Sequence, residues 1–530
     1  MITPINKKAL SKIVEEERVL FKFPDTNKFA IDVAVGYPAS YRVGMSNLAL
    51  HFLYSGIKRR REFRVGRFFL DTAPFTVERG IRIAHCRLVF VTVSYEEDYF
   101  NLVRILERSG IEPLRDRRAA SKHSRGEGVP IIIAGGPAVS ANPAPVSEIV
   151  DAVVLGEGDD VLAELLEAAM MVLDINRDEF LERLASIEGI FVPKITSSRV
   201  PVIIASSAES YTSSAILTPN TAFPDTFLVE IGRGCPGWCN FCLARSIYGR
   251  FRYVPFDRLT VLFSTVPRGA RVGLVSTAAA SHPGFIEILE LLKSRSHHVQ
   301  VSSLRADDID TAKARALNEV GVRSVALAPE SGSERVRFIL GKRVRDEVYF
   351  DAVASLRKAG IGRFSFYMMI GCPGEDEGAL DESDHFLAEL KRSLEGASAS
   401  IHLNILIPKP QTPFQYLPIC EERELARRLN EMKRIIVQRG FALRNKSVKG
   451  AYRQAVLSCG DESVGRAVVL NVVDKVPWKK ALSGVDFDDS FLRREKTADA
   501  KFPWSNLRGP NDPKRLYSRY ERSKKLLRGQ

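Results

Sequence analysis

The sequence predicts an α/β protein in which parallel sheets come first and a mainly helical segment comes last. Three observations support this fold class. Short apolar stretches with the length of buried strands alternate with longer stretches that show helical spacing of their apolar residues. Several strand-like stretches end in glycine turns, as in open parallel sheets that bind ligands at the carboxyl ends of their strands. After residue 420 the chain contains a charged amphipathic helix and shorter helical pieces.

Length and composition limit the classes of protein to which this chain can belong. With 530 residues, 45% of them hydrophobic, the chain can form two or three domains with full cores. No apolar run approaches a membrane span and the start lacks the core of a secretory signal, so we expect a cytoplasmic protein with no membrane contact. The seven cysteines are an odd number and do not suggest a disulfide framework. A net charge of +13 favours acidic partners or nucleic acid.

Residues 20–195 are expected to form the first domain, with residues 196–226 as a connector. Its strands are placed at 29–37, 87–94, 130–134 and 149–155, and its helices at 46–61, 99–109 and 159–173. Ser46 is a possible N-cap of the first of these helices. The strand ends carry polar or glycine residues, which are Ser94, Gly135, Gly136 and Gly156. A glycine pair after a strand is first of all a turn.

Residues 227–420 contain six strand-then-helix units. The expected strands are 227–231, 271–276, 299–304, 324–328, 363–370 and 400–406. The expected helices are 256–264, 283–295, 309–320, 343–359 and 377–393. Candidate site residues follow successive strands, namely Ser276, Thr277, Ser303, Arg305, Glu330 and Gly371. Each alone suits ordinary turn or cap chemistry, but their recurrence favours a shared pocket.

The first of these strands leads into a cysteine triplet with C-x3-C-x2-C spacing, Cys235, Cys239 and Cys242. Three thiolates suit a metal, and three ligands on a four-iron, four-sulfur cluster would leave one iron open for a substrate or cofactor. A structural zinc site wants four ligands, and no His or Cys lies within thirty residues after Cys242. Three unrelated buried cysteines are the remaining alternative.

The triplet, with Phe241 directly before Cys242, resembles the signature of the radical S-adenosylmethionine (SAM) enzymes. The resemblance implies a [4Fe-4S] cluster on the three cysteines, SAM on its open iron, and electron transfer that cleaves SAM to a 5'-deoxyadenosyl radical. It implies that residues 227–420 form a (β/α)6 partial TIM barrel and that the six strand-end residues named above contact SAM. It also implies an electron donor such as flavodoxin or ferredoxin.

The first domain resembles the cobalamin-binding, Rossmann-like domain of one branch of that family. The matching phrases begin at Tyr37, Ser94, Gly135 and Asp151. The resemblance implies cobalamin contacts at Ser94, Gly135, Gly136 and Gly156, and methylation of an unactivated carbon as the reaction. The branch's D-x-H-x-x-G pattern is absent, since Ala39 and Tyr41 stand in the Asp and His places. Cobalamin would therefore bind without a protein histidine, or the domain has lost it and the radical drives rearrangement or sulfur insertion.

Residues 421–530 are expected to form a helical extension with a basic tail. The last thirty residues carry nine lysines and arginines against two acidic residues, together with Trp504, Tyr517 and Tyr520. Basic residues with aromatics can hold RNA through phosphate contacts and stacking. A solvated tail, or a helix packed on the catalytic domain, is the favoured alternative. The competing function class is a zinc-containing nucleic-acid-binding protein.

Overall fold

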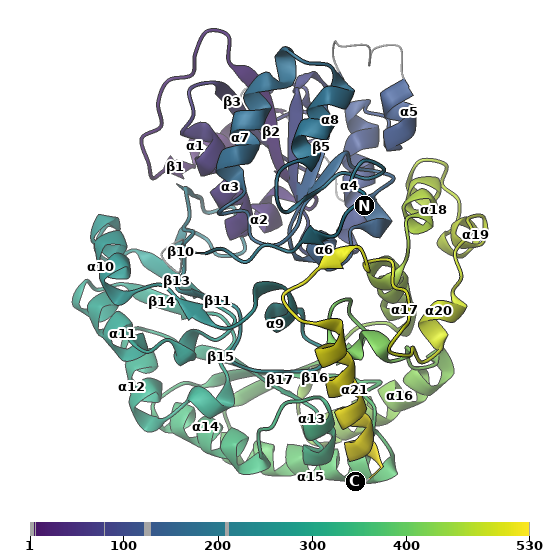
Figure 1. Cartoon of the computed structure of the whole chain (residues 1–530). Coiled ribbons are helices and arrows are strands. Elements are labelled where there is room, and N and C mark those ends of the chain that lie inside the picture. The colour runs from purple at the N-terminus through teal and green to yellow at the C-terminus, as the bar shows by residue number, and fades with distance from the viewer. Residues whose placement is uncertain (1–4, 6, 79, 121–128, 207–210, 529–530) are drawn as a thin grey trace. The chain divides into compact units, whose positions relative to one another are not determined.

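The computed structural model describes the chain except for residues 1–4, 6, 79, 121–128, 207–210 and 529–530. The chain forms two compact units, and both are discontinuous in sequence (Figure 1). Unit 1 comprises Met1–Thr226, Val456–Asp488 and Lys501–Pro510. Unit 2 comprises Phe227–Ala455, Asp489–Ala500 and Asn511–Gln530. None of the described helices is both long and apolar enough to cross a membrane.

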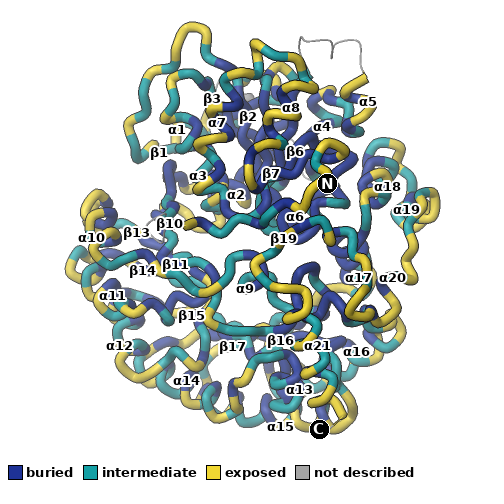
Figure 2. The backbone as a smooth tube through the Cα atoms, viewed as in Figure 1, coloured by how far each residue is buried: buried dark blue, intermediate teal, exposed yellow. Residues whose placement is uncertain are grey.

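Unit 1 contains an open, mostly parallel sheet with the strand order β3-β2-β4-β5-β6-β7. The strands are β3 (Phe63–Phe69), β2 (Ile31–Tyr37), β4 (Leu88–Thr92), β5 (Ile131–Gly135), β6 (Ala152–Val154) and the antiparallel β7 (Ile190–Phe191). Their continuous apolar sequences are buried, as expected of a parallel sheet covered on both faces (Figure 2). The expected parallel sheet is therefore confirmed.

The edge strand β3 was not expected from the sequence. Its run of Phe63–Phe69 contains Arg64 and Arg67, which interrupt an otherwise apolar strand pattern. Arg67 is nevertheless buried, because its guanidinium pairs with Glu17 at 2.6 Å and with Glu78 at 2.5 Å. A buried cation that is fully paired is compatible with a strand interior, and this pairing depends on distant residues.

Along the chain of unit 1, helices come after the expected strands. They include α3 (Leu48–Lys58), α4 (Asp98–Ser109), α7 (Leu162–Met170) and α8 (Arg177–Ala185). The cap of α3 differs from the expectation, because Asn47 accepts from Ala49 N at 2.9 Å while Ser46 Oγ donates to Arg42 O at 2.8 Å. Asn is at least as good a cap as Ser, so the helix begins one residue later.

Two late segments of the chain complete unit 1. The strand β19 (Leu507–Arg508) pairs in parallel with β8 (Val200–Pro201) of the expected connector. The helix α18 (Ser463–Val472) packs on α4, and Asn142 Nδ2 donates to Ser458 O and Gly460 O at 3.1 and 2.8 Å. The expected extension 421–530 is thus divided between the two units. Local sequence carries no signal of this, because these short pieces acquire partners only in the folded chain.

Unit 2 contains the six expected strands in two sheets. One sheet has the order β10-β13-β14, and the other has the parallel order β15-β16-β17-β18. A parallel bridge between Leu304 and Leu327 joins the end of the first sheet to β15. The strands are β10 (Thr226–Glu230), β13 (Arg271–Val275), β14 (His298–Val301), β15 (Ser324–Glu330), β16 (Arg363–Ile370), β17 (Ser398–Ile405) and the unexpected β18 (Ala442–Asn445).

The helices of unit 2 alternate with its strands and lie along their outside in Figure 1. They are α10 (Phe256–Thr265), α11 (Phe285–Ser294), α12 (Thr311–Glu319), α14 (Asp346–Lys358), α15 (Glu377–Leu394) and α16 (Glu422–Gln438). The α/β class and the alternation are therefore confirmed. Closure of the strands into a partial barrel stays a prediction.

Candidate functional site

The cysteine loop, residues 235–242, follows β10 and a two-residue strand β11 (Gly232–Arg233) that pairs with β12 (Arg252–Tyr253). Gly234 opens the loop at φ 72°, and a Cβ on it would collide with the carbonyl oxygen of Arg250. Only glycine suits such a position. Thr277, which follows β13, donates its hydroxyl hydrogen to Gly234 O. The ends of two neighbouring strands therefore hold the start of the loop.

The three cysteines share one electrostatic environment. Burial raises the pKa of Cys239 to about 12 and that of Cys242 to about 11. Cys235 and Glu330 raise both pKa values further, whereas Lys342 lowers them. Three thiols, a carboxylate and an ammonium thus act on one another at the end of the loop. As free thiols Cys239 and Cys242 stay protonated at neutral pH, and metal binding would release their protons.

The three cysteines are the candidate ligands for an iron-sulfur cluster at this loop. Among the described residues, no group of three or more His, Cys, Asp or Glu side chains is placed to hold one ion. A zinc site gathers four donors around one point, whereas a four-iron cluster takes one thiolate per iron and so spaces them apart. Gly237 lets Arg305 approach the loop closely, because a Cβ there would lie 2.6 Å from Arg305 Nη1 and 3.5 Å from Cys235 Sγ.

Glu330 stands at the irregular end of β15. The register between β15 and β16 shifts after Leu327, and Glu330 has φ 70°, a conformation that costs energy for a residue with a side chain. Its Oε1 lies 3.1 Å from Lys342 Nζ, which also donates to Ala328 O. Although burial lowers the pKa of Lys342, nearby groups, Glu330 foremost, raise that pKa overall. The local strain therefore places a charged pair beside Cys239.

Sequence reasoning missed Lys342, although its neighbourhood carries a signal. Gly341 has φ 77° directly after α13 (Glu334–Ile339), and a Cβ on it would lie 2.6 Å from Trp238 O. A glycine followed by two basic residues at a helix end marks a close approach of backbone to backbone. Only the folded structure shows that the approaching segment is the cysteine loop.

The other predicted residues of unit 2 differ in their surroundings. Arg305 pairs with Asp307 and lies 3.6 Å from Asp308, next to the cysteine loop. Ser276 is buried, and its Oγ accepts from Ala278 N at 3.2 Å. Ser303 is exposed. The structure thus brings Thr277, Arg305 and Glu330 to the cysteines, whereas Ser276 and Ser303 have turn and surface positions.

Gly371 forms a separate cluster at the end of β16. It has φ 77°, and its N–H donates to Glu375 Oε2 at 2.7 Å. The same carboxylate oxygen accepts from Arg428 Nη1 at 2.9 Å. Burial nevertheless raises the pKa of Glu375 to about 7, despite the opposing effect of Arg428. The backbone of this turn is thus held by a largely buried carboxyl group.

The basic tail forms α21 (Pro513–Leu527), which packs along the cysteine loop. Arg519 donates to Trp238 O at 2.6 Å and to Asn240 Oδ1 at 2.9 Å, and Asn240 Nδ2 donates to Ser523 Oγ at 2.7 Å. Three guanidinium groups also lie with their central carbons 4.5 Å from the centroid of the Trp238 ring; they belong to Arg245, Arg515 and Arg519. Of the alternatives for the tail, the packed helix is the one that the structure shows.

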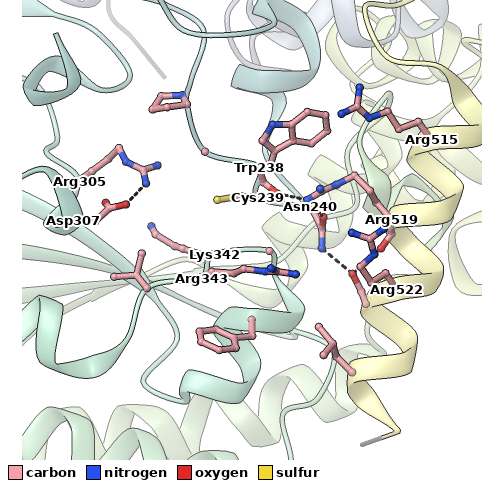
Figure 3. Close-up of a pocket in the computed structure, with 17 residues that line it drawn as sticks. Trp238, Cys239, Asn240, Arg305, Asp307, Lys342, Arg343, Arg515, Arg519 and Arg522 are labelled. Atoms are coloured by element: carbon pink, nitrogen blue, oxygen red, sulfur yellow. Dashed lines mark hydrogen bonds and ion pairs between the residues drawn. The ribbon is translucent and has the colours of Figure 1, made fainter. Parts of the chain in front are cut away.

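A pocket of about 490 Å³ lies between the cysteine loop and α21 (Figure 3). Figure 3 shows the arginines of α21 facing Trp238 and Asn240, with Arg305, Asp307 and Lys342 across the pocket. Cys239 itself lines it. The cysteine loop is therefore flanked by a pocket of the size that small-molecule sites have.

In unit 1, two of the predicted glycines pack against the protein's own backbone. Gly136 has φ 111° and a Cβ on it would lie 2.6 Å from Val93 O, while Gly156 has φ 91° and faces Ile203 O. Gly135 has ordinary space, since its Cβ would lie 3.7 Å from Val154 Cβ. Ser94 Oγ accepts from Asn47 Nδ2 at 3.2 Å. Internal packing alone therefore requires glycine at positions 136 and 156.

Tyr41, at the place of the missing histidine, is buried in unit 1. Its hydroxyl donates to Glu17 at 2.5 Å, and burial raises its pKa strongly. The nearby His51 is also engaged through both ring nitrogens, because Nε2 lies 3.0 Å from Met45 O and Nδ1 accepts from Ala215 N at 3.1 Å. Both side chains serve the fold.

Family models match segments of both units. The N-terminal model of radical SAM proteins matches residues 49–193, and the radical SAM superfamily model matches residues 229–387. An uncharacterized protein of Methanocaldococcus jannaschii is 28% identical over 446 residues, 83% of this chain and 91% of that protein. An uncharacterized methyltransferase of Pyrococcus horikoshii is 24% identical over 272 residues, 49% of this chain and 58% of that protein.

The chain is also similar to solved structures, among them two radical SAM enzymes. The methyltransferase TsrM of Kitasatospora setae, with cobalamin and a [4Fe-4S] cluster bound, is 13% identical with a TM-score of 0.49, covering 94% of this chain and 99% of that chain. The cobalamin-dependent enzyme OxsB, with aqua-cobalamin bound, is 14% identical with a TM-score of 0.46, covering 68% of this chain and 52% of that chain.

Proposed function

The chain belongs to the radical SAM superfamily, and we propose that it uses SAM and cobalamin to methylate an unactivated carbon. Enzymes of this superfamily hold a [4Fe-4S] cluster and SAM, the two groups expected at the cysteine loop. The observation that carries the proposal is the placement of the three-cysteine loop, which is held by Thr277 at Gly234 O and packed at Trp238 O against Gly341, next to the Lys342 partner of Glu330. That arrangement places thiolate ligands next to a charged pair of side chains.

The residues of unit 2 have distinct roles in this proposal. Cys235, Cys239 and Cys242 would hold the cluster, and the cluster would supply the electron for reductive cleavage of SAM. Thr277 fixes the start of the loop through Gly234 O. Glu330, held by Lys342, presents a carboxylate that suits the SAM amine or a ribose hydroxyl.

Arg305 and the turn after β16 supply the remaining contacts that we assign to SAM. The Arg305 guanidinium suits the SAM carboxylate, and it already lies against Gly237 of the cysteine loop. The turn at Gly371 suits adenine, because the bond to Glu375 holds its backbone. Ser276, Thr277 and Ser303 stay predictions as direct SAM contacts.

Unit 1 is the proposed cobalamin domain, and cobalamin supplies the methyl group that is transferred. Cobalamin should bind without a protein imidazole on cobalt, because Tyr41 and His51 are both engaged within the fold. Ser94 and Gly135 are the better candidates for contact, since Gly136 and Gly156 face the protein's own backbone. Without cobalamin, the same radical would drive rearrangement or sulfur insertion.

The proposed partners follow from this chemistry. A flavodoxin or ferredoxin would donate the electron, and the cytoplasm is the compartment that keeps cluster thiols reduced. RNA contact through the tail is a weaker proposal, because α21 turns Arg515 and Arg519 toward Trp238. The zinc-containing nucleic-acid-binding alternative is disfavoured by the match to the radical SAM superfamily model.

Cobalamin binding tests the proposed reaction. Electron paramagnetic resonance of bound cob(II)alamin should show no nitrogen splitting from a lower axial ligand. Gly135→Val should fold, because its Cβ meets Val154 at an ordinary 3.7 Å, yet the added branches should weaken cobalamin binding about tenfold in equilibrium dialysis.

A control variant and a refuting result complete the test of cobalamin binding. Ala138→Val lies at a buried position of the helix that follows Gly136 and tests whether added bulk in this region alone changes binding. A correctly folded wild-type protein that retains no cobalamin would refute the methyl-transfer proposal and make cobalamin-free radical chemistry the leading function.

A further inference from the structure

The pocket beside the cysteine loop carries more positive charge than the fold uses. Its lining includes Arg305, Lys342, Arg343, Arg515, Arg519 and Arg522. Asp307 is the one carboxylate among the described lining residues, and it is paired with Arg305. Lys342 is paired with Glu330 just outside the lining. Of the remaining four arginines, Arg519 donates to Trp238 O and Asn240 Oδ1 and Arg515 lies over the Trp238 ring, and all four add positive charge to the pocket.

These four arginines lie close enough to repel one another. Burial lowers the pKa of Arg519 first, and Arg522, Arg515 and Arg343 each lower it further. Within the described chain, Arg343, Arg515 and Arg522 have no carboxylate within salt-bridge distance, and all three are exposed. Like charges gathered on one wall cost stability unless an anion is bound. The arrangement is thus expected of a binding site.

We propose that the substrate of the radical reaction carries a phosphate or diphosphate group, which this arginine pocket binds beside the cysteine loop. The inference rests on the proposed function for the identity of the reaction. The charge of Arg343, Arg515 and Arg522, which no carboxylate balances, is comparable to the about two to three negative charges that a diphosphate carries, and planar guanidinium donors bind phosphate oxygens in pairs. A single carboxylate would leave most of this charge unbalanced.

The rest of the pocket suits a small molecule with an apolar part. Phe338, Val344 and Leu526 line it together with Trp238. A volume of about 490 Å³ falls within the range of small-molecule sites. An extended RNA strand would instead use exposed cations outside the pocket lining, such as Lys525 of α21 and its C-cap Arg528. The observations therefore favour a small phosphorylated molecule.

Pyrophosphate binding to the full-length, cluster-loaded protein tests the proposal. Equilibrium dialysis with radiolabelled inorganic pyrophosphate at fixed ionic strength should show saturable binding. Arg343→Gln and Arg522→Gln should each weaken it about tenfold, which corresponds to about 1.4 kcal/mol. Lys525→Gln is the matched control, since this exposed lysine of α21 lies outside the pocket lining, and it should change binding by less than about twofold.

Three results would overturn the proposal. One is pyrophosphate binding that is absent, or equally tight in the Arg343→Gln/Arg522→Gln double variant. Another is competitive displacement of pyrophosphate by SAM, which would assign the pocket to SAM. The third is polyuridylate binding that Lys525→Gln weakens as much as Arg522→Gln does, which would assign the arginines to RNA. Iron content measured after dialysis confirms that pyrophosphate has not removed the cluster.

The outcome is separable from that of the proposed function. Dialysis measures binding and requires no SAM cleavage. A protein that binds pyrophosphate as described and fails to cleave SAM would contradict the proposed function alone. A protein that cleaves SAM and does not bind pyrophosphate would contradict this inference alone.

Discussion

Single residues in this protein are placed by constraints that reach across the fold. Glu330 adopts φ 70° at the end of β15 and meets Lys342 at 3.1 Å, twelve residues further along the chain. Gly341 admits the Trp238 carbonyl that a side chain would exclude. Strand-end position was enough to single out Glu330 from the sequence. Its partner was missed, because the pairing depends on how the loop after α13 returns to the strands of unit 2.

Glu375 gives the clearest residue-scale prediction, a stability that depends on pH. Its folded pKa is raised from 4.5 to about 7 by burial, so the folded state holds a proton that the unfolded state has released. The free energy of unfolding should therefore fall as pH rises from about 4.5 to 7. Glu375→Gln removes the titrating group. Relative to wild type, its free energy of unfolding should rise by about 2 kcal/mol between pH 5 and pH 8.

Urea denaturation at the two pH values measures this difference. The glutamine side chain of the Glu375→Gln variant is neutral at both pH values, and its amide oxygen can still accept from Gly371 N. A difference between variant and wild type that stays constant from pH 5 to pH 8 would show that the carboxyl group of Glu375 is not the one that titrates.

At the scale of elements, the apolar strands were predictable from the sequence, and contacts with residues far away in the chain were not. The six strands of unit 2 lie within a few residues of the expected ranges, because each is a continuous or alternating apolar run. The strand β3 was hidden by Arg67, whose burial requires Glu17 and Glu78. The helix α21 was recognised as basic, but its contact with Trp238 joins residues 281 positions apart. Sequence spacing does not encode such a contact.

The helix α21 should act as a clamp on the cysteine loop. Arg519→Ala removes two charge-assisted hydrogen bonds, to Trp238 O and Asn240 Oδ1, and leaves Asn240 with a weaker hold on α21. Such bonds contribute about 1 to 3 kcal/mol each. The reconstituted cluster should therefore release iron to a chelator about tenfold faster than in wild type.

The matched control is Lys514→Ala, which removes an exposed cation from the first turn of the same helix. Its iron release should equal that of wild type. Equal release from Arg519→Ala and wild type would mean that α21 packs beside the loop without restraining it.

At the scale of the molecule, both units are built from segments that are far apart in the sequence. Unit 1 is completed by residues 456–488 and 501–510, and unit 2 by α21. The division near residue 227 was foreseeable from the change to a polar connector before β10. The later exchanges were not, because short helices and two-residue strands carry too little local signal. Truncation after residue 420 should consequently damage both units, and point variants are the better tests.

Reductive cleavage of SAM tests the central claim most directly. After anaerobic reconstitution, the wild-type protein should hold about four irons per chain and convert SAM to 5'-deoxyadenosine when reduced. Cys239→Ala should lose both the cluster and the product. Cys372→Ala, a buried cysteine beside Glu375 with no assigned ligand role, should retain both. Full 5'-deoxyadenosine formation by Cys239→Ala would contradict the assignment of the cysteine loop as the catalytic centre.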